Sequence, residues 1–306
     1  MNRFLLRLLV PAAVISASLT GLSAAPASAE LVQKGRVVHV GDGDTVDVDI
    51  YGDGTSATRR IRMTGIQAME LTTYSGYDDR LRGECHAVEA TKRLRRLTLD
   101  RTVKVTAHYA SSMSGSRYRR TIWVYRDGAW RDAAALLLRE GHGLWLPNGT
   151  EYTTNRATAA AAARAAAERR GLWDTDYCGA GPYQSVPLRV AVKWNADGDD
   201  SKNVNGEYVK ITNNGSVTVP LGGWRVRDSA LRGYLGRGYV FPSSAKLGAG
   251  RSLYLHVGRG SNSTSHFYWG LDRPIFENAS GSPKYSGDGG YLFDPQGDLR
   301  AWHQYH

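Results

Sequence analysis

The stretch RVVHVGDGDTVDVDI, residues 36–50, carries the clearest indication of the fold. The apolar-rich run at 36–40 precedes the turn Gly41-Asp42-Gly43-Asp44, and the run at 45–50, in which polar and apolar residues alternate strictly, follows it. Such alternation is typical of half-buried strands, and Gly and Asp favour tight turns. The stretch therefore predicts a strand, a turn and a second strand. Asp42 and Asp44 are two residues apart, so in extended backbone both carboxylates would point to one face, where they would suit a hard cation. Out of context, such a turn is usually only a turn.

Outward from this stretch, periodicity predicts further strands and then helices. The strands are expected at 59–63, 103–105 and 121–125, and the helices at 84–97, 131–139 and 154–170. Segment 111–116 between two of the strands is predicted to be a loop. From residue 207 onward, short strand-like runs separated by Asn-Gly, Gly-Gly and Pro-containing turns predict an all-β sandwich.

Composition and length support two globular domains. The chain has 306 residues, 42% hydrophobic and 22% charged, which excludes a fibrous or wholly disordered protein. We place the domain boundary in the Gly-, Pro- and Ser-containing segment 177–187, giving domains at 30–182 and 183–306. The formal net charge of +10 fits an acidic polymer such as nucleic acid, but by itself it is a weak indication.

The first 29 residues have the pattern of a secretory signal peptide. Arg3 and Arg7 precede an apolar run that ends in Ala27-Ser28-Ala29, which predicts cleavage before Glu30 and secretion. An uncleaved anchor is the alternative. No later stretch has about 18 consecutive apolar residues, so we expect no membrane span in the mature chain.

Cys85 and Cys178 are the only two cysteines. Because secretion places them in an oxidising compartment, we predict that they form a disulfide. Two free thiols are the alternative. We also expect the mature protein to be a monomer.

Several N-terminal motifs together resemble the staphylococcal nuclease (thermonuclease) family. They are Val40-Gly41-Asp42-Gly43-Asp44-Thr45-Val46, Arg62 with Gly65-Ile66-x-Ala68-x-Glu70, Arg119 before Trp123-Val124-Tyr125-Arg126-Asp127-Gly128, and the tail at 136–148 and 171–173. The resemblance covers about residues 31–175. It implies a five-stranded OB-fold barrel with three helices, in agreement with the predicted order of elements.

The resemblance also implies a catalytic site for phosphodiester hydrolysis. Asp44 would be a calcium ligand with Asp42 as a secondary contributor, and Arg62 and Arg119 would hold the phosphate. Glu70 would orient or deprotonate the attacking water. The implied activity is a secreted, calcium-dependent nuclease that cleaves DNA and/or RNA and leaves 3′-phosphate ends. Trp145 occupies the place of a family aromatic that stacks on a base. Packing in the core or at its rim is the alternative for this side chain.

The chain departs from the family pattern between Ile66 and Glu70. Gln67, Ala68 and Met69 stand where the family has Asp, Thr and Pro. The Gln67 carbonyl and the Ala68 backbone carbonyl can both ligate calcium, but one ligand charge is lost and calcium affinity should fall. Either the enzyme has a weaker metal dependence, or it is a non-catalytic extracellular nucleic-acid-binding or envelope-adhesion protein. Retention of Glu70 favours the enzyme, because binding alone does not need this carboxylate.

Residues 186–306 resemble a lamin-tail domain. The resemblance rests on segment 205–228 with Trp224, on Tyr239-Val240-Phe241-Pro242 and on segment 290–299. It implies an immunoglobulin-like sandwich and names no ligand. Within it, segment 195–200 resembles a calcium-binding loop in its Asp and Asn content. It lacks Gly at the sixth position and Glu at the twelfth, so we expect a solvated turn.

Overall fold

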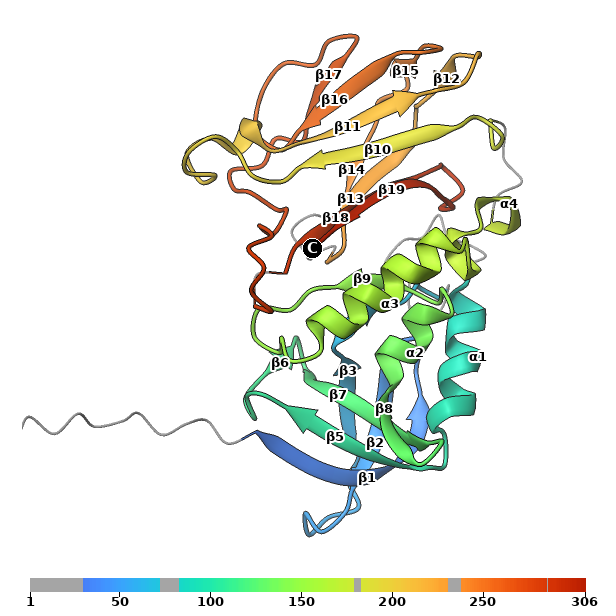
Figure 1. The fold of residues 1–306 in the computed structure, drawn as a ribbon, viewed down its shortest axis with the longest axis vertical. Helices are drawn as coiled ribbons and strands as arrows, with labels where there is room; N and C mark the ends of the chain where they lie inside the picture. The colour runs from blue at the N-terminus through green and yellow to red at the C-terminus, as the bar shows by residue number, and fades with distance from the viewer. Residues whose placement is uncertain (1–29, 72–82, 179–182, 231–237, 285) are drawn as a thin grey trace, which may run out of the picture.

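A computed structural model describes residues 30–71, 83–178, 183–230, 238–284 and 286–306. The predicted signal peptide lies outside these described residues. Figure 1 shows two layers, a barrel with its helices below and a β-sandwich above. No helix within the described ranges combines the length and apolar character that a membrane crossing requires.

The lower layer is built on a closed five-stranded barrel. Its strands are β1 (Leu31–Val40), β2 (Thr45–Ile50), β3 (Arg59–Met63), β5 (Thr102–Ala107) and β7 (Arg117–Arg126). Strands β3, β2, β1, β5 and β7 pair antiparallel in that order, and a parallel pairing of β3 with β7 closes the circle. Alternate side chains fill the interior, including Val37, Val46 and Ile122, each with no exposed surface. The predicted barrel of OB type is therefore confirmed.

Short strands and helices surround the barrel. The strands are β4 (Gly65–Gln67), which pairs with β9 (Leu144–Leu146), β6 (Met113–Ser114) and β8 (Ala129–Asp132). The helices are α1 (Ala87–Thr98), α2 (Ala133–Arg139), α3 (Asn155–Ala167) and the short α4 (Thr175–Cys178), with a 3₁₀ turn at Gly171–Trp173. The described chain thus has one more helix than the three expected, and segment 111–116 contains β6 where only a loop was expected.

The upper layer is the predicted β-sandwich. One sheet has the order β10 (Leu188–Lys193), β11 (Tyr208–Asn213), β16 (Ser252–His256) and β17 (His266–Tyr268). The other has the order β14 (Tyr239–Val240), β13 (Arg225–Asp228), β18 (Asp288–Phe293) and β19 (Leu299–Tyr305). A separate pair is formed by β12 (Val219–Pro220) and β15 (Lys246–Leu247). Trp224, Phe241 and Leu255 are among the buried residues between the sheets.

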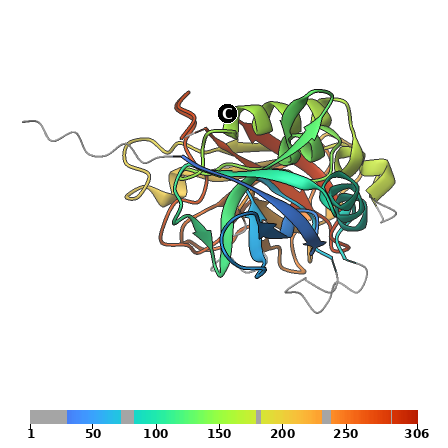
Figure 2. The same ribbon diagram turned by 90° about the horizontal axis from the view of Figure 1, so that it is seen from below.

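The two layers pack through an apolar cluster. Trp173 of the lower layer lies against Trp302 of β19, with ring centroids 5.0 Å apart, and against the buried Tyr291 of β18. The amide of Gln304 donates to the backbone carbonyl of Ala159 in α3 at 3.2 Å. Helix α3 accordingly lies between the barrel and the sandwich (Figure 1). Figure 2 shows the molecule from below, with the barrel toward the viewer.

The predicted disulfide between Cys85 and Cys178 is present. It joins the segment just before α1 to the end of α4, across a sequence separation of 93 residues. The covalent link therefore holds the last helix before the sandwich against the barrel's first helix.

Candidate active site

The turn between β1 and β2 holds two buried carboxylates. Asp42 is 9% exposed and Asp44 is 3% exposed. The backbone N–H of Asp44 donates to Oδ1 of Asp42 at 3.0 Å, and the hydroxyl of Thr45 donates to Oδ1 of Asp44 at 3.1 Å. These local bonds fix the turn and place the Asp44 carboxylate toward the interior of the site.

Gly43 lets this turn approach its neighbours closely. A Cβ atom at this position would lie 2.6 Å from Cβ of Ala68 and 2.7 Å from Cβ of Ala90 in α1. Any larger residue would therefore displace the carboxylate-bearing turn from both the segment after β4 and helix α1.

Arg62 occupies the centre of the site. Its position on β3 pairs with Thr45 of β2 on one side and with Arg119 of β7 on the other. The guanidinium places Nη1 2.7 Å from Oδ2 of Asp44, and Nη2 donates to Oε1 of Gln67 at 2.7 Å. Arg62 is 6% exposed, so these partners determine its orientation.

Gln67 links Arg62 to Glu70. Its Oε1 accepts from Arg62, while its Nε2 donates to Oε1 of Glu70 at 3.2 Å and to the Ala68 backbone carbonyl at 3.3 Å. The side chain therefore uses both ends of its amide, which a carboxylate in the same place cannot do because it has no donor.

Glu70 follows β4 and lies near the carboxylates of Asp42 and Asp44. Its pKa is raised from 4.5 to about 7, first by burial and then by the nearby carboxylates of Asp44 and Asp42, while Arg62 and Arg227 oppose the shift. Arg227 belongs to β13, so the sandwich contributes to the electrostatics of this carboxyl group. A carboxyl group with a pKa near neutrality is suited to exchange a proton during catalysis.

Asp44 and Asp42 have the donor chemistry of a calcium site. The pKa of Asp44 is raised to about 7, chiefly by burial and also by Asp42, while Arg62 opposes the shift. A hard cation would relieve the repulsion between the negative charges of these two carboxylates. Calcium takes oxygen ligands of this kind. The chemistry of Asp42 and Asp44 is therefore compatible with a calcium ion.

Gln67 and Ala68 do not offer their oxygens in the same way. Oε1 of Gln67 accepts from Arg62, and the Ala68 carbonyl accepts from Gln67. It is the backbone N–H of Ala68, not its carbonyl, that contacts Asp44, at 2.8 Å from Oδ2. In this structure the Gln67 and Ala68 oxygens take part in hydrogen bonds within the protein.

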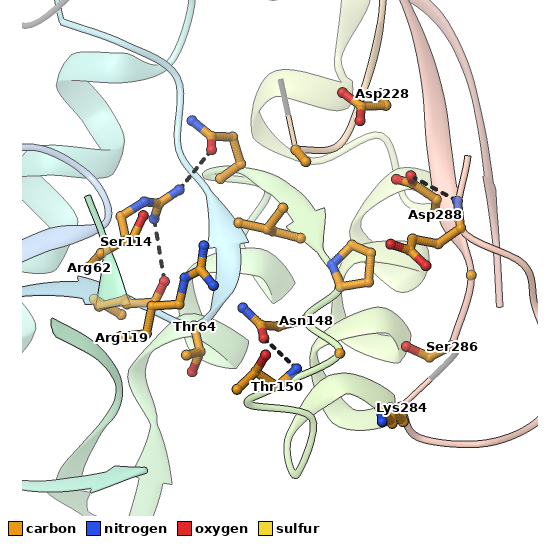
Figure 3. Close-up of a pocket in the computed structure, with 18 of the residues that line it drawn as sticks. Arg62, Thr64, Ser114, Arg119, Asn148, Thr150, Asp228, Lys284, Ser286 and Asp288 are labelled. Atoms are coloured by element: carbon orange, nitrogen blue, oxygen red, sulfur yellow. Dashed lines mark hydrogen bonds between the residues drawn. The ribbon is translucent and has the colours of Figure 1, made fainter. Parts of the chain in front are cut away.

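A pocket of about 650 Å³ opens between the barrel and the sandwich. On the barrel side it is lined by the predicted residues Arg62, Glu70 and Arg119, and by Gln67. The opposite side belongs to the sandwich, where Asp228, Glu277, Lys284, Ser286 and Asp288 contribute. Figure 3 shows Arg62 and Arg119 facing Asp228 and Asp288 across this space. Asp42 and Asp44 are not among the residues that line it.

Trp145 lies in the core and does not line the pocket. It has no exposed surface, packs with the barrel cluster, and its Nε1 has no hydrogen-bond partner among the described residues. The next residue of β9, Leu146, does line the pocket. Successive side chains of a strand point to opposite faces, so Trp145 is directed inward and the core-packing alternative describes this side chain.

Arg117 is a site residue that the sequence argument missed. Its Nη1 donates to the Thr45 hydroxyl at 3.0 Å, and its side chain lines the pocket. The sequence feature that could have identified it is its position two residues before Arg119 on the same strand, because residues two apart on a strand share a face. Arg120, by contrast, is buried and donates to the backbone carbonyls of Ser112 and Ala110 at 3.0 and 2.7 Å.

Comparison with known proteins informs the upper layer. No curated protein matches the chain. The family model described as Lamin Tail Domain matches residues 191–306. These residues include both sheets of the sandwich except the first part of β10. The C-terminal β-sandwich of this protein is therefore a lamin tail domain of immunoglobulin-like fold.

Proposed function

We propose that the protein is a hydrolase that cleaves phosphodiester bonds of DNA and/or RNA. The observation that carries the proposal is the meeting of Arg62, Arg119 and Glu70 in one pocket. Two guanidinium groups and one carboxyl group with a pKa near 7 are the groups that this reaction needs. The N-terminal motifs that resemble the staphylococcal nuclease family support the same assignment.

The two arginines would bind the scissile phosphate. Negative charge grows on the phosphoryl oxygens as the reaction proceeds, so fixed guanidiniums stabilise the transition state more than the bound substrate. Arg62 is held by Asp44 and Gln67 before any substrate arrives. Its placement therefore costs little reorganisation during the reaction.

Glu70 would act on the attacking water. The water oxygen forms a bond to phosphorus, the bond from phosphorus to the 5′ oxygen breaks, and Glu70 takes the proton that the water loses. The 5′ oxygen leaves with a proton from solvent, and the phosphate stays on the 3′ end. Gln67 would keep Oε1 of Glu70 in place through its hydrogen bond.

Calcium would be held by Asp44 with Asp42. Bound there, the ion would offset negative charge on the phosphoryl oxygens. Since Gln67 brings no ligand charge, we expect weaker calcium binding than a site with a further carboxylate would have.

The competing function is nucleic-acid binding without hydrolysis. One observation favours it: Asp44 is already paired with Arg62, at 2.7 Å. The test is cleavage of a dye-quenched single-stranded DNA and of an RNA by the mature protein, residues 30–306, across a calcium titration with a chelator control. Cleavage that rises with calcium and leaves 3′-phosphate ends supports the nuclease. Salt-dependent binding with no cleavage at any calcium concentration supports the competing function.

A further inference from the structure

The two walls of the pocket carry different charged groups. The barrel wall presents Arg62, Arg117 and Arg119 beside Glu70. The wall formed by the lamin tail domain presents the carboxyl groups of Asp228, Glu277 and Asp288 together with Lys284, and burial raises the pKa of Asp288 to about 7. Figure 3 shows Asp228, Asp288, Ser286 and Lys284 on the side opposite the two labelled arginines. A ligand that fills this pocket meets cations on one side and mainly hydrogen-bond acceptors on the other.

The lamin-tail wall is held firmly in place. Asn155 of α3 donates to the Pro283 backbone carbonyl at 2.9 Å, and Arg156 donates to the Gly281 carbonyl at 2.6 Å. These two carbonyls belong to the segment that leads to Ser286. Together with the apolar cluster around Trp173, the contacts make the lamin tail domain a fixed part of the pocket.

Two features show that this wall is organised for contact with a polar ligand. Oδ1 of Asp288 accepts from the backbone N–H groups of Gly289 at 2.7 Å and Ser229 at 3.2 Å, which fixes the carboxylate. Ser286 lines the pocket, is 8% exposed, and its hydroxyl has no hydrogen-bond partner among the described residues. A buried hydroxyl without a partner gains free energy when a ligand supplies one.

The chemistry of the two walls distinguishes the parts of a nucleotide. A phosphate is attracted to the guanidiniums and repelled by the carboxylates, so it binds at the barrel wall. Carboxylates accept hydrogen bonds from the amino and imino groups of nucleobases, and guanine, adenine and cytosine each carry an amino group that thymine lacks. In a duplex these base edges are already paired. A pocket of about 650 Å³ also has the size of a small-ligand site and does not admit a double helix.

We infer that the lamin tail domain forms the base-recognition wall of the substrate pocket, and that the preferred substrate is a single strand with an amino-bearing base, guanine, adenine or cytosine, beside the scissile phosphate. Glu277 is the exposed carboxylate of this wall and the one that a flexible strand reaches most readily. The inference rests on the proposed nuclease function and goes beyond it, because it names the substrate class and the domain that selects it.

The test compares cleavage at one varied position in otherwise all-thymine single-stranded oligonucleotides, with duplex forms of the same sequences. The wild type should cleave beside guanine, adenine or cytosine about tenfold faster than beside thymine, since one good base contact contributes about 1–3 kcal/mol. Glu277→Gln should reduce this preference at least threefold. Asp272→Asn, an exposed carboxylate of the same domain outside the pocket lining, should leave it unchanged.

The outcomes separate the inference from the proposed function. Equal cleavage of all bases, equal cleavage of duplex and single strand, or an unchanged preference in active Glu277→Gln would overturn the inference and leave the nuclease intact. If the wild type cleaves no oligonucleotide, the proposed function fails, and fluorescence anisotropy with the same oligonucleotides then decides. Tighter binding of the guanine-, adenine- or cytosine-containing strand that depends on Glu277 would still support the base-recognition wall, whereas equal binding would overturn it.

Discussion

The side-chain amide of Gln67 donates a hydrogen bond to Oε1 of Glu70, with 3.2 Å between the two atoms. The same amide accepts from Arg62, so one neutral side chain connects the group proposed to bind phosphate to the group proposed to activate water. The residue that departs from the nuclease pattern therefore has a structural role of its own.

Replacing Gln67 tests that role. Gln67→Asp removes the donor to Glu70 and adds a carboxylate near Asp44, so calcium should bind more tightly and the calcium midpoint of cleavage should fall about tenfold. Gln67→Asn, which is neutral and shorter, is the matched control and should not lower the midpoint. Calcium titrations of the cleavage rate provide the measurement. An unchanged midpoint in Gln67→Asp would show that this position does not act on the metal.

The two neighbouring arginines Arg117 and Arg120 should behave differently. Arg117→Ala removes a guanidinium from the pocket, so substrate binding should weaken about tenfold and the salt dependence of log K should become shallower by about one charge, with little change in melting temperature. Arg120→Ala removes the side-chain donor to the Ala110 carbonyl and one of two donors to the Ser112 carbonyl, which keeps the backbone N–H of Arg119, so it should mainly lower stability. Binding isotherms at several salt concentrations and thermal melts distinguish the two. Equal effects of both variants on binding would contradict the assignment.

Trp145 should matter for stability and not for base stacking. Trp145→Ala should lower the free energy of unfolding by about 3–5 kcal/mol, because it leaves a large cavity in the barrel core. Trp145→Phe is the milder variant, and its KM for single-stranded DNA should equal that of the wild type. Denaturant unfolding and steady-state kinetics give the two quantities. A KM raised severalfold in a fully folded Trp145→Phe protein would restore a role in substrate binding.

The disulfide between Cys85 and Cys178 should stabilise the protein substantially. Loss of a native disulfide typically costs about 2–5 kcal/mol, and long closed loops lie toward the upper end. A double replacement, Cys85→Ser with Cys178→Ser, should therefore unfold at lower denaturant concentration. Reductant should shift the wild-type transition and have no effect on the double variant. Coincident wild-type transitions with and without reductant would show that the bond adds little.

Glu207 should give the lamin tail domain a stability that depends on pH. Burial raises its pKa from 4.5 to about 8, although the backbone N–H groups of Ile275 and Phe276 oppose this. Because the folded-state pKa exceeds the unfolded value, the contribution of this group is fully present below about pH 4.5 and is lost as pH rises through about 8. Glu207→Gln, which stays neutral, should lose less stability between pH 5 and pH 9 than the wild type. Thermal melts at these pH values test this, and parallel losses in both proteins would contradict it.

Local sequence patterns predicted much of the fold. Strict alternation at 45–50 gave β2, helical spacing at 84–97 gave most of α1, and the Ala-rich segment at 154–170 gave α3. Helix α4 was not predicted, because four residues are too few for a periodic signal. The barrel closure depends on the parallel pairing of β3 with β7, which only the resemblance implied.

The candidate site was predicted in part. The motifs named Arg62, Glu70 and Arg119, and the structure brings these three to one pocket. The orientation of Trp145 was not predictable, because β9 has three residues and its register against β4 decides which side chain points inward. The wall around Glu277 depends on packing between two domains, and no local pattern encodes that arrangement.

The central claim is that Glu70 is the group that turns a phosphate-binding pocket into a catalytic one. The most direct measurement is the cleavage rate of a dye-quenched single-stranded DNA by the mature wild type and by Glu70→Gln at saturating calcium, with DNA binding measured on both proteins. The account predicts cleavage by the wild type, a rate at least 100-fold lower for Glu70→Gln, about the loss expected when a general base is removed, and nearly equal binding. A Glu70→Gln protein that cleaves at the wild-type rate would contradict it.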